Sequence, residues 1–181
     1  MPELSNRYSQ YYQSPLGRML LISDAGLLTG LYFDRQKYLP CFVPEPQAKT
    51  FQVFEAAKRW LDAYFSGEDP GFTPPLGLEG SPFRRAVWDV LLTIPFGKTI
   101  TYTQIAERIA RQMGIKRVSA RAVGNAVAHN PISLIIPCHR VVGYKGSLTG
   151  YGGGIERKAW LLVMEGVDMQ GLFIPGKGTA L

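Results

Sequence analysis

Residues 119–142 read SARAVGNAVAHNPISLIIPCHRVV, a helix signal followed directly by an apolar run. Ser119 is a favoured helix N-cap, and Pro131 disfavours a helical conformation in the residue before it, so a short helix is predicted between Ser119 and Asn130. The segment 132–142 is apolar on both sides of Cys138, which predicts a buried, extended run. The stretch therefore joins a short helix to a buried cysteine.

The short helix is built almost entirely of small residues. Its small members are Ser119, Ala120, Ala122, Gly124, Ala126 and Ala128, and its one long cationic side chain is Arg121. Such a face can enter the minor groove of DNA, which is only about 6 Å wide, or it can pack tightly inside the protein. Composition alone supports these two interpretations equally. Arg121 favours the groove, because Arg side chains insert into minor grooves. Its ordinary alternative is a surface salt bridge.

Cys138 is followed by His139 and Arg140. A buried free cysteine is more often an inert packing residue than a nucleophile, but cationic or proton-accepting neighbours lower a thiol pKa from about 8.5. A buried histidine needs its own partner, and a carboxylate on one imidazole nitrogen leaves the other free to accept a proton. Glu165, at the end of a helix predicted over 156–165, is the candidate partner, and Glu156 and Asp168 are the other carboxylates nearby in the chain.

The first part of the chain predicts a small mixed domain. Aromatic and aliphatic runs at 8–13, 18–23 and 27–33 are separated by turn residues, which is typical of an antiparallel meander. Apolar side chains then recur at helical spacing from 51 to 65. A stretch rich in Gly and Pro, 67–80, indicates a linker.

Beyond the linker the pattern becomes helical. Residues 1–80 are therefore predicted to form an N-terminal domain with its linker, and residues 81–181 a second domain. A helix is predicted to start at Ser81 and to end by Pro95, and Thr103 is predicted to cap a second short helix before the one that begins at Ser119. Two short helices joined by a turn suggest a helix-turn-helix.

The positive charge is concentrated in the second half. Net charge is +6 overall; residues 1–80 carry 7 basic and 9 acidic side chains, whereas residues 81–160 carry 12 basic and 3 acidic ones. Lys and Arg that displace counterions supply most non-specific affinity for nucleic acid. A polyanion bound by the second half is favoured over a basic face without a partner.

Composition narrows the class of protein. With 46% hydrophobic and 19% charged residues, the chain is expected to be globular. No apolar run reaches the roughly 18 residues needed to span a bilayer, and the polar start is unlike a signal peptide. We therefore expect a cytoplasmic protein that has no contact with a membrane, with both cysteines as free thiols.

At this point the chain resembles a known family. Pro137-Cys138-His139-Arg140 matches the active-site signature of the O6-alkylguanine-DNA alkyltransferases. Further fragments match in the family's order: Ile94-Pro95-Phe96-Gly97, Thr101-Tyr102, Ala120-Arg121-Ala122-Val123-Gly124, Asn130-Pro131, Thr149-Gly150-Tyr151, Trp160-Leu161-Leu162 and Glu165-Gly166. The resemblance implies an α+β fold: a ribonuclease-H-like N-terminal α/β domain and a mainly helical C-terminal domain bearing a minor-groove helix-turn-helix.

The resemblance also implies the reaction. An alkyl group of O6-alkylguanine in DNA, with O4-alkylthymine as an open second substrate, passes to Cys138 in a single turnover after the damaged base is flipped out. Glu165 would orient His139, and His139 would take the proton of Cys138 through a water, because neighbouring side chains of an extended segment diverge. Tyr102 would donate a proton to the guanine, and Asn130 would tie the recognition helix to the active-site segment.

Other matched residues are implied to bind the substrate. The main-chain carbonyls of Cys138 and Val141 would accept from the guanine amino group, the Gly152 amide would lie near O6, and Tyr151 would help to set the size of the pocket. In the DNA interface, Arg121 would fill the place of the flipped base. The other implied DNA contacts are Ser119, Ala122, Thr103 and Tyr144.

No metal or cofactor is expected. Cys41, His129, Cys138 and His139 are all the Cys and His residues of the chain, and their spacing fits no tetrahedral zinc pattern. Cys41 is interpreted as structural or incidental. The expected partner is double-stranded DNA, bound by a monomer.

Two other classes of protein remain as alternatives. A cysteine hydrolase could use Cys138, His139 and Glu165, but that hypothesis leaves the basic half and the small-residue helix unexplained. A non-catalytic DNA-binding module that senses alkylated bases is closer, yet relatives of that kind lack the active-site cysteine.

Overall fold

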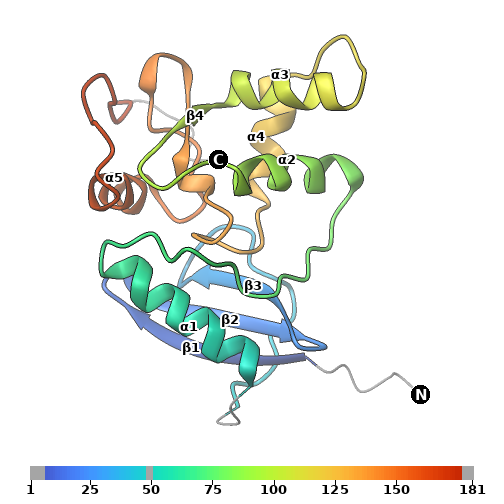
Figure 1. Ribbon diagram of the computed structural model, residues 1–181, viewed down its shortest axis with the longest axis vertical. Coiled ribbons are helices and arrows are strands. Elements are labelled where there is room, and N and C mark those ends of the chain that lie inside the picture. Colours follow the sequence, from blue (N-terminus) through green and yellow to red (C-terminus); the bar gives the residue numbers. More distant parts are fainter. Residues whose placement is uncertain (1–6, 48–50, 177–181) are drawn as a thin grey trace. The chain divides into compact units, whose positions relative to one another are not determined.

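The computed structural model describes residues 7–47 and 51–176, which fall into two compact units (Figure 1). The first unit contains the chain up to Glu79 together with residues 131–133; the second contains residues 80–130 and the chain from 134 onward. The break after Glu79 lies in the stretch interpreted as a linker.

The first unit is a three-stranded antiparallel sheet with one helix. The strands β1 (Arg7–Ser14), β2 (Gly17–Asp24) and β3 (Leu27–Phe33) pair in the order β1-β2-β3. Ala25 and Gly26 join β2 to β3 with positive φ angles of 47° and 82°, the conformation of a two-residue type I′ hairpin turn. The predicted meander is confirmed.

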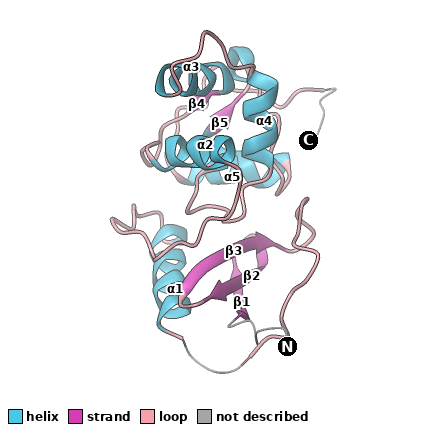
Figure 2. Ribbon diagram, turned by 90° about the vertical axis from the view of Figure 1, so that its right-hand side faces the viewer, coloured by secondary structure: helices cyan, strands magenta, loops and turns pink. Residues whose placement is uncertain are grey.

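The helix α1 (Gln52–Phe65) contacts all three strands (Figure 2). Because side chains alternate along a strand, one face of the sheet carries a set of fully buried residues, namely Met19, Leu21, Leu31 and Phe33. The buried stripe of α1 includes Phe54, Ala57, Leu61 and Tyr64, all fully buried, at the helical spacing expected from the sequence. Leu20, Ile22 and Tyr32 form a separate cluster.

A distant piece of chain completes this unit. The main-chain N–H of Leu31 donates to the carbonyl of Pro131 at 2.9 Å, and the N–H of Ser133 donates to the carbonyl of Leu31 at 2.8 Å. The segment 131–133 thus lies parallel to β3 at one bridge, Leu31 to Ile132. No local pattern in either segment predicts this pairing.

The second unit is mainly helical. Its longer helices are α2 (Pro82–Leu92), α3 (Tyr102–Gln112), α4 (Ala120–Ala128) and α5 (Ile155–Met164). Short elements complete it: β4 (Ile100–Thr101) pairs in parallel with β5 (Val141–Val142), and the 3-10 turns η1 and η2 span Cys138–Arg140 and Tyr144–Gly146.

The starts of these helices follow from their capping residues. The Ser81 and Ser119 side chains accept from the backbone N–H groups of Arg84 and Ala122, as expected of N-caps. The predicted cap at Thr103 is wrong: Thr101 is the N-cap of α3, and Thr101 and Gln104 form a reciprocal capping box. That box satisfies two backbone donors at once, so the helix begins earlier than predicted.

The apolar run before β5 is buried, but the prediction that it is extended is wrong. Leu134 has a φ of 71°, and Cys138 to Arg140 form a 3-10 turn instead of a strand. Pro137 has no N–H to donate to a ladder, and the turn is closed by the Arg140 N–H, which donates to its carbonyl at 3.0 Å. Cys138 is therefore presented on a tight turn.

Within residues 7–47 and 51–176, every helix is too short or too polar to cross a lipid bilayer.

Candidate active site

Cys138 lies at the start of η1 and is 6% exposed. Asn130, just beyond the end of α4, donates from Nδ2 to the Cys138 Sγ at 3.1 Å and to the carbonyl of Ile136 at 2.8 Å. One buried amide thus links the end of α4 to the segment that carries the cysteine.

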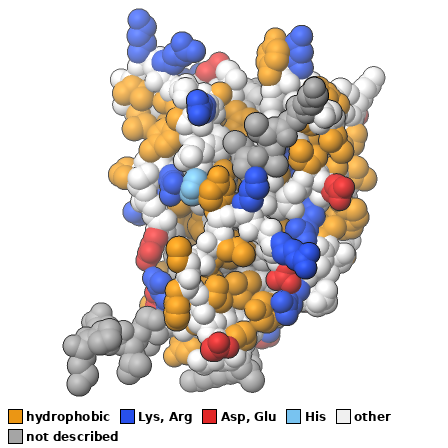
Figure 3. Space-filling view, turned by 180° about the vertical axis from the view of Figure 1, so that it is seen from behind, with side chains coloured by type: hydrophobic (Ala, Val, Ile, Leu, Met, Phe, Trp, Pro, Cys, Tyr) orange, Lys and Arg blue, Asp and Glu red, His pale blue; other side chains and the backbone are white. Residues whose placement is uncertain are grey.

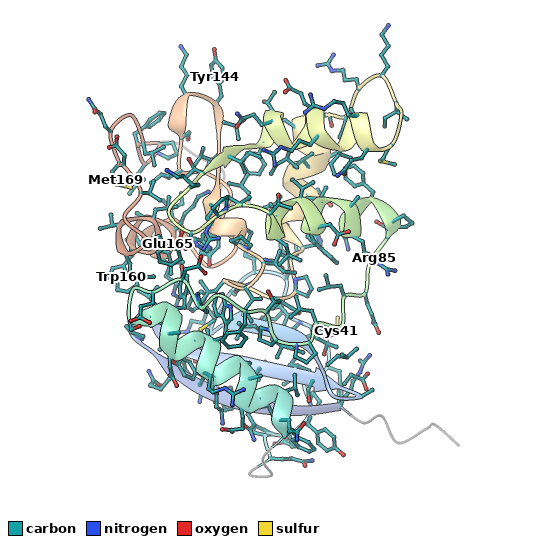
Figure 4. The ribbon with its side chains drawn as sticks, viewed as in Figure 1. Cys41, Arg85, Tyr144, Trp160, Glu165 and Met169 are labelled. Carbon is teal, nitrogen blue, oxygen red and sulfur yellow. The ribbon has the colours of Figure 1, made fainter. Side chains whose placement is uncertain are left out.

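His139 is fully buried, and its Nε2 lies 2.6 Å from Oε1 of Glu165. Glu165, labelled in Figure 4, is the C-cap residue of α5. Because the carboxylate accepts, Nε2 carries the proton and Nδ1 is the nitrogen with the lone pair. The structure therefore brings together His139 and the carboxylate proposed for it from the sequence.

Glu165 has further partners that the sequence did not suggest. Arg140 donates to both of its carboxylate oxygens, at 2.8 and 3.1 Å, and the Gly97 N–H donates to Oε2 at 3.1 Å. Burial raises the pKa of Glu165, but the hydrogen bonds and charges of His139 and Arg140 outweigh it and lower the pKa to about 2. The carboxylate is therefore ionised and held in a fixed orientation.

The pKa values of the thiol and the imidazole suit a proton transfer between them. Burial raises the pKa of Cys138, against the opposing hydrogen bond from Asn130 and the charge of Lys158. Burial lowers the pKa of His139, against the opposing effect of Glu165. At neutral pH the resting site thus holds a protonated thiol and a neutral imidazole that can act as a base.

The two tyrosines of the site are both buried. Tyr102, the first residue of α3, donates from its hydroxyl to the carbonyls of Gly150 at 3.2 Å and Thr149 at 3.4 Å. The Tyr151 ring lies edge-on to the His139 imidazole, with 6.3 Å between ring centres. Its hydroxyl is buried and has no hydrogen-bond partner in the part of the chain that the structure describes. Burial raises the pKa of both phenols, so both keep their protons.

Lys158 is the site residue that sequence reasoning missed. It lies on α5, is fully buried, and donates from Nζ to the carbonyls of Val141 and Thr149. Its position three and four residues before the buried Leu161 and Leu162 was the available signal, because such residues share one helix face. The Val141 carbonyl, expected to accept from guanine, thus already has one donor and retains a second lone pair.

Only some of the residues expected to contact DNA line the same hollow. An open hollow of about 250 Å³ has walls from α3, α4, η2 and the loop before Tyr151; it is lined by Tyr102, Thr103, Ala120, Arg121, Gly124, Tyr144 and Thr149. Ser119 and Ala122 are not part of this lining, and the Ser119 side chain is used as the cap of α4. Gly152, expected near O6, follows Tyr151 and is half-buried.

Exposed cations lie on the two helices that contribute to this hollow and in the turn between them. Arg108, Arg111, Lys116, Arg117 and Arg121 are all exposed on α3, on α4 or in the turn between them, and Lys and Arg side chains are prominent on the face shown in Figure 3. Tyr144, at the tip of η2, is 81% exposed and points away from the protein (Figure 4). In residues 7–47 and 51–176, no cluster of three or more His, Cys, Asp or Glu side chains could hold a metal ion.

Two domain families match the two halves of the chain. Residues 7–78 match the 6-O-methylguanine DNA methyltransferase, ribonuclease-like domain, and residues 82–167 match the 6-O-methylguanine DNA methyltransferase, DNA binding domain. The expected α+β architecture, with a ribonuclease-like N-terminal domain and a helical C-terminal domain, is confirmed.

Named relatives align over most of their length. A methylated-DNA–protein-cysteine methyltransferase of Mycobacterium tuberculosis is 45% identical over 155 residues, which cover 84% of this chain and 88% of the relative. The protein of that name from Haemophilus influenzae is 41% identical over 159 residues, covering 87% and 86%.

Solved structures agree with the sequence comparison. The crystal structure of Mycobacterium tuberculosis OGT in complex with DNA superposes with a TM-score of 0.73 at 44% identity, covering 87% of this chain and 92% of that one. The O6-methylguanine-DNA methyltransferase of the hyperthermophilic archaeon Pyrococcus kodakaraensis gives a TM-score of 0.51 at 25% identity, covering 89% and 99%. The chain therefore belongs to the 6-O-methylguanine DNA methyltransferase family.

Proposed function

We propose that this protein repairs alkylated DNA by moving the alkyl group from O6 of guanine to Sγ of its own Cys138. One observation carries the proposal: in a chain of this family, the buried Cys138 accepts a hydrogen bond from Asn130 and is followed by His139, whose imidazole pairs with Glu165. The named methyltransferase relatives support the reaction class.

The proposed chemistry starts with the proton of the thiol. Glu165 holds Nε2 of His139, so that Nδ1 takes the proton of Cys138 through one water. The sulfur then attacks the alkyl carbon, the carbon–oxygen bond breaks, and its electron pair stays on guanine O6. The products are a thioether at Cys138 and a guanine whose charge is relieved by a proton from Tyr102. The proton that His139 took from the thiol then replaces the one that Tyr102 lost, so both side chains end neutral.

Main-chain groups would orient the base during this step. The carbonyls of Cys138 and Val141 accept from the guanine amino group, and the Gly152 amide donates near O6. Tyr151, whose ring lies beside His139, forms a wall of the pocket. O4-alkylthymine presents a comparable alkyl–oxygen bond and is the second substrate to test.

The damaged nucleotide must leave the base stack before it can react, since the bond attacked is not accessible inside the duplex. We assign α3 and α4 to a helix-turn-helix that binds the minor groove, with Arg121 in the place of the flipped base. Thr103 and Tyr144 line the adjacent hollow, and Ser119 and Ala122 would approach the backbone from the start of α4. The solved complex of the Mycobacterium tuberculosis protein with DNA supports DNA as the partner.

The protein is proposed to act as a monomer within the cell and without a cofactor, because the nucleophile, the base and the acid are all side chains of one unit. Each molecule would act once and inactivate itself.

Mass spectrometry tests the proposal directly. The protein is mixed with a duplex that contains O6-methylguanine and is then digested; the peptide with Cys138 should gain one methyl group, and the DNA should contain unmodified guanine. Methyl on the Cys41 peptide, or binding without transfer, would refute it. Turnover of an ester or peptide would favour a cysteine hydrolase instead.

A further inference from the structure

Arg140 has a buried guanidinium, and each of its three nitrogens donates a hydrogen bond. Nε donates to Oε2 of Glu165 at 2.8 Å, Nη2 donates to Oε1 at 3.1 Å, and Nη1 donates to the carbonyl of Ile94 at 2.7 Å. The Arg140 Cζ also lies 5.6 Å from the centre of the Phe96 ring. The planar fork of arginine matches a carboxylate with two parallel bonds, so the structure fixes Arg140 on Glu165.

One oxygen of this carboxylate is shared between Arg140 and His139. Oε1 of Glu165 accepts from Nε2 of His139 at 2.6 Å and from Nη2 of Arg140 at 3.1 Å. Both partners of the His139–Glu165 pair have fully buried side chains. The negative charge that would hold a proton on the imidazole is therefore also bound directly by a permanent cation.

A count of charges shows what this sharing does to the imidazole. Burying a net charge is costly, whereas a paired, hydrogen-bonded charge is tolerated. Glu165 and Arg140 together are neutral, so a neutral His139 leaves the three side chains without net charge. Without Arg140, the same balance would require a second proton on His139, because an opposite charge nearby favours the charged form of a group.

Lys158 is also a buried cation of the site, but it is bound elsewhere. Its Nζ donates to two main-chain carbonyls, and in the described residues no carboxylate forms an ion pair with it. Its charge lowers the pKa of His139 in the same sense as that of Arg140. Arg140 differs because it contacts the carboxylate oxygen that His139 uses.

The neutral neighbours of His139 add no charge to this balance. The Tyr151 ring lies edge-on to the imidazole, and burial raises the pKa of its phenol, which stays protonated. Burial also raises the pKa of the adjacent Cys138, so the thiol holds its proton at rest. Burial lowers the pKa of His139 itself, against the opposing effect of Glu165.

We propose that Arg140 is a positioning residue that keeps the imidazole of His139 uncharged by occupying the carboxylate of Glu165, an inference that rests on the proposed alkyl transfer. Glu165 alone would hold a proton on Nδ1 at rest, and the imidazole could not then act as the base. With Arg140 bound, Nδ1 stays deprotonated until it takes the proton of Cys138. The carboxylate still orients the ring and stabilises the imidazolium that forms during the transfer.

The test follows the imidazole directly. Histidine labelled with nitrogen-15 reports by NMR the protonation of both ring nitrogens as the pH is varied. His129→Gln assigns the signals, because His129 and His139 are the two histidines of the chain. Arg140→Met removes the charge and the donors, whereas Arg140→Lys keeps the charge. Arg85→Met removes an exposed arginine of the same unit, labelled in Figure 4, and is the matched control.

In Arg140→Met the pKa of His139 should rise by about one unit or more, which is about a tenfold change in the ratio of protonated to neutral imidazole. Arg140→Lys should give a smaller rise, because a cation remains available to the carboxylate, and Arg85→Met should give none. An unchanged titration in Arg140→Met, or equal rises in the Met and Lys variants, would overturn the inference.

The pH dependence of methyl transfer separates control of charge from general damage to the site. If His139 must be neutral to accept the thiol proton, the acid limb of the pH–rate profile should move to higher pH in Arg140→Met. A variant that only distorts the site would lose rate by the same factor at every pH, and that result would contradict the role of Arg140.

Wild-type protein covers the case in which neither Arg140 variant folds, as checked by circular dichroism and thermal melting. At neutral pH its His139 should carry a proton on Nε2 and none on Nδ1. A wild-type imidazole with protons on both nitrogens at neutral pH would refute the inference without any variant.

The outcome is separable from that of the proposed function, because the NMR titration needs no DNA. If wild-type protein accepted no methyl group from O6-methylguanine DNA, the alkyl-transfer proposal would fail, whatever the titration showed. Normal methyl transfer together with an unchanged His139 titration in Arg140→Met would refute the role of Arg140 alone.

Discussion

Glu165 binds three groups of the site, since its carboxylate accepts hydrogen bonds from His139, Arg140 and the Gly97 N–H. Glu165→Gln should slow methyl transfer by about ten- to a hundredfold, because a neutral amide does not stabilise the protonated imidazole, and general base catalysis contributes on the order of a hundredfold or more. The final amount of methylated protein should not change. Single-turnover kinetics on O6-methylguanine DNA measure both quantities.

The matched control is Glu156→Gln, an exposed carboxylate in the first turn of the same helix. It should leave the rate unchanged. A lower plateau in Glu165→Gln, with an unchanged rate, would show that the carboxylate is needed for folding and not for activation of His139.

The same carboxylate should make stability depend on acidity. Its pKa in the folded protein is about 2, below its usual value of 4.5, so its contribution is complete above about pH 4.5 and is lost as the pH falls through about 2. A shift of this size corresponds to about 3 kcal/mol. Urea unfolding between those pH values should show a steeper loss of stability in wild-type protein than in Glu165→Gln, and equal slopes would contradict the assignment.

Some of these residue roles were accessible from the sequence and some were not. Cys138 and His139 are adjacent in the chain, and Glu165 is a polar residue at the end of a helix, so local reasoning could suggest all three as a catalytic set. Arg140 was expected only as a cationic neighbour of the thiol, and Lys158 was not singled out, although its spacing from Leu161 and Leu162 places it on the buried face of α5. Their placement depends on tertiary contacts with Glu165 and with main-chain carbonyls.

We propose that the DNA-binding role of α4 depends on Arg121, which is exposed and lines the same hollow as Tyr102 and Tyr144. Arg121→Ala should slow transfer on duplex DNA by about tenfold or more, because nothing then occupies the space of the flipped base. The loss should be smaller on single-stranded or mismatched substrate, where unstacking costs less. Transfer rates on matched substrates measure the difference.

Arg108→Ala is the comparison, because Arg108 is exposed on α3 and outside that hollow. It should weaken binding of both substrates to a similar degree. If Arg121→Ala slowed transfer equally on duplex and single strands, its role would be that of a phosphate contact.

Elements with strong local signals could be predicted, and those that depend on competing signals could not. The meander followed from its turns, and α2 and α4 from Ser81 and Ser119, whose side chains cap them. The start of α3 did not, because Thr101 and Thr103 are both good N-caps and only the reciprocal bond to Gln104 decides between them. The turn at Cys138 follows a run whose apolar composition suits a strand equally well.

For the whole molecule, the division of charge predicts how DNA binding responds to salt. Five exposed cations on α3, on α4 and in the turn between them could each displace a counterion, so affinity for duplex DNA should fall about a hundredfold or more between roughly 50 and 200 mM salt, with little base preference. Titration at several salt concentrations gives the slope. Arg117→Ala should reduce the salt slope by about one, whereas Arg59→Ala, on α1, should leave the slope unchanged. A strong consensus sequence for binding would contradict the expected lack of base preference.

The pairing of residues 131–133 with β3 could not be predicted from local sequence patterns. Their pairing with Leu31 joins positions about a hundred residues apart, and neither segment has a pattern that names its partner. Along the chain, this segment lies directly between Asn130 and the run that leads to Cys138. The unpredicted pairing therefore involves the part of the chain that connects two residues of the candidate site.

The last prediction concerns turnover and follows from the bond that is formed. A thioether at Cys138 has no electrophilic carbonyl for water to attack, so His139 cannot regenerate the thiol as it could from an acyl-enzyme. Product should therefore stop accumulating at one equivalent of active protein, however large the excess of O6-methylguanine DNA. Quantifying repaired guanine against protein concentration measures the plateau.

Cysteine variants assign that plateau to one sulfur. Cys138→Ala and Cys138→Ser should abolish or nearly abolish it, since a hydroxyl beside His139 is a far weaker nucleophile than a thiolate. Cys41→Ala should leave it intact, because Cys41 is exposed in the first unit, whereas His139 and Glu165 belong to the second. Consumption of excess substrate, or a plateau that disappears with Cys41, would exclude the transfer mechanism, because only an irreversible bond at Cys138 limits each molecule to one reaction.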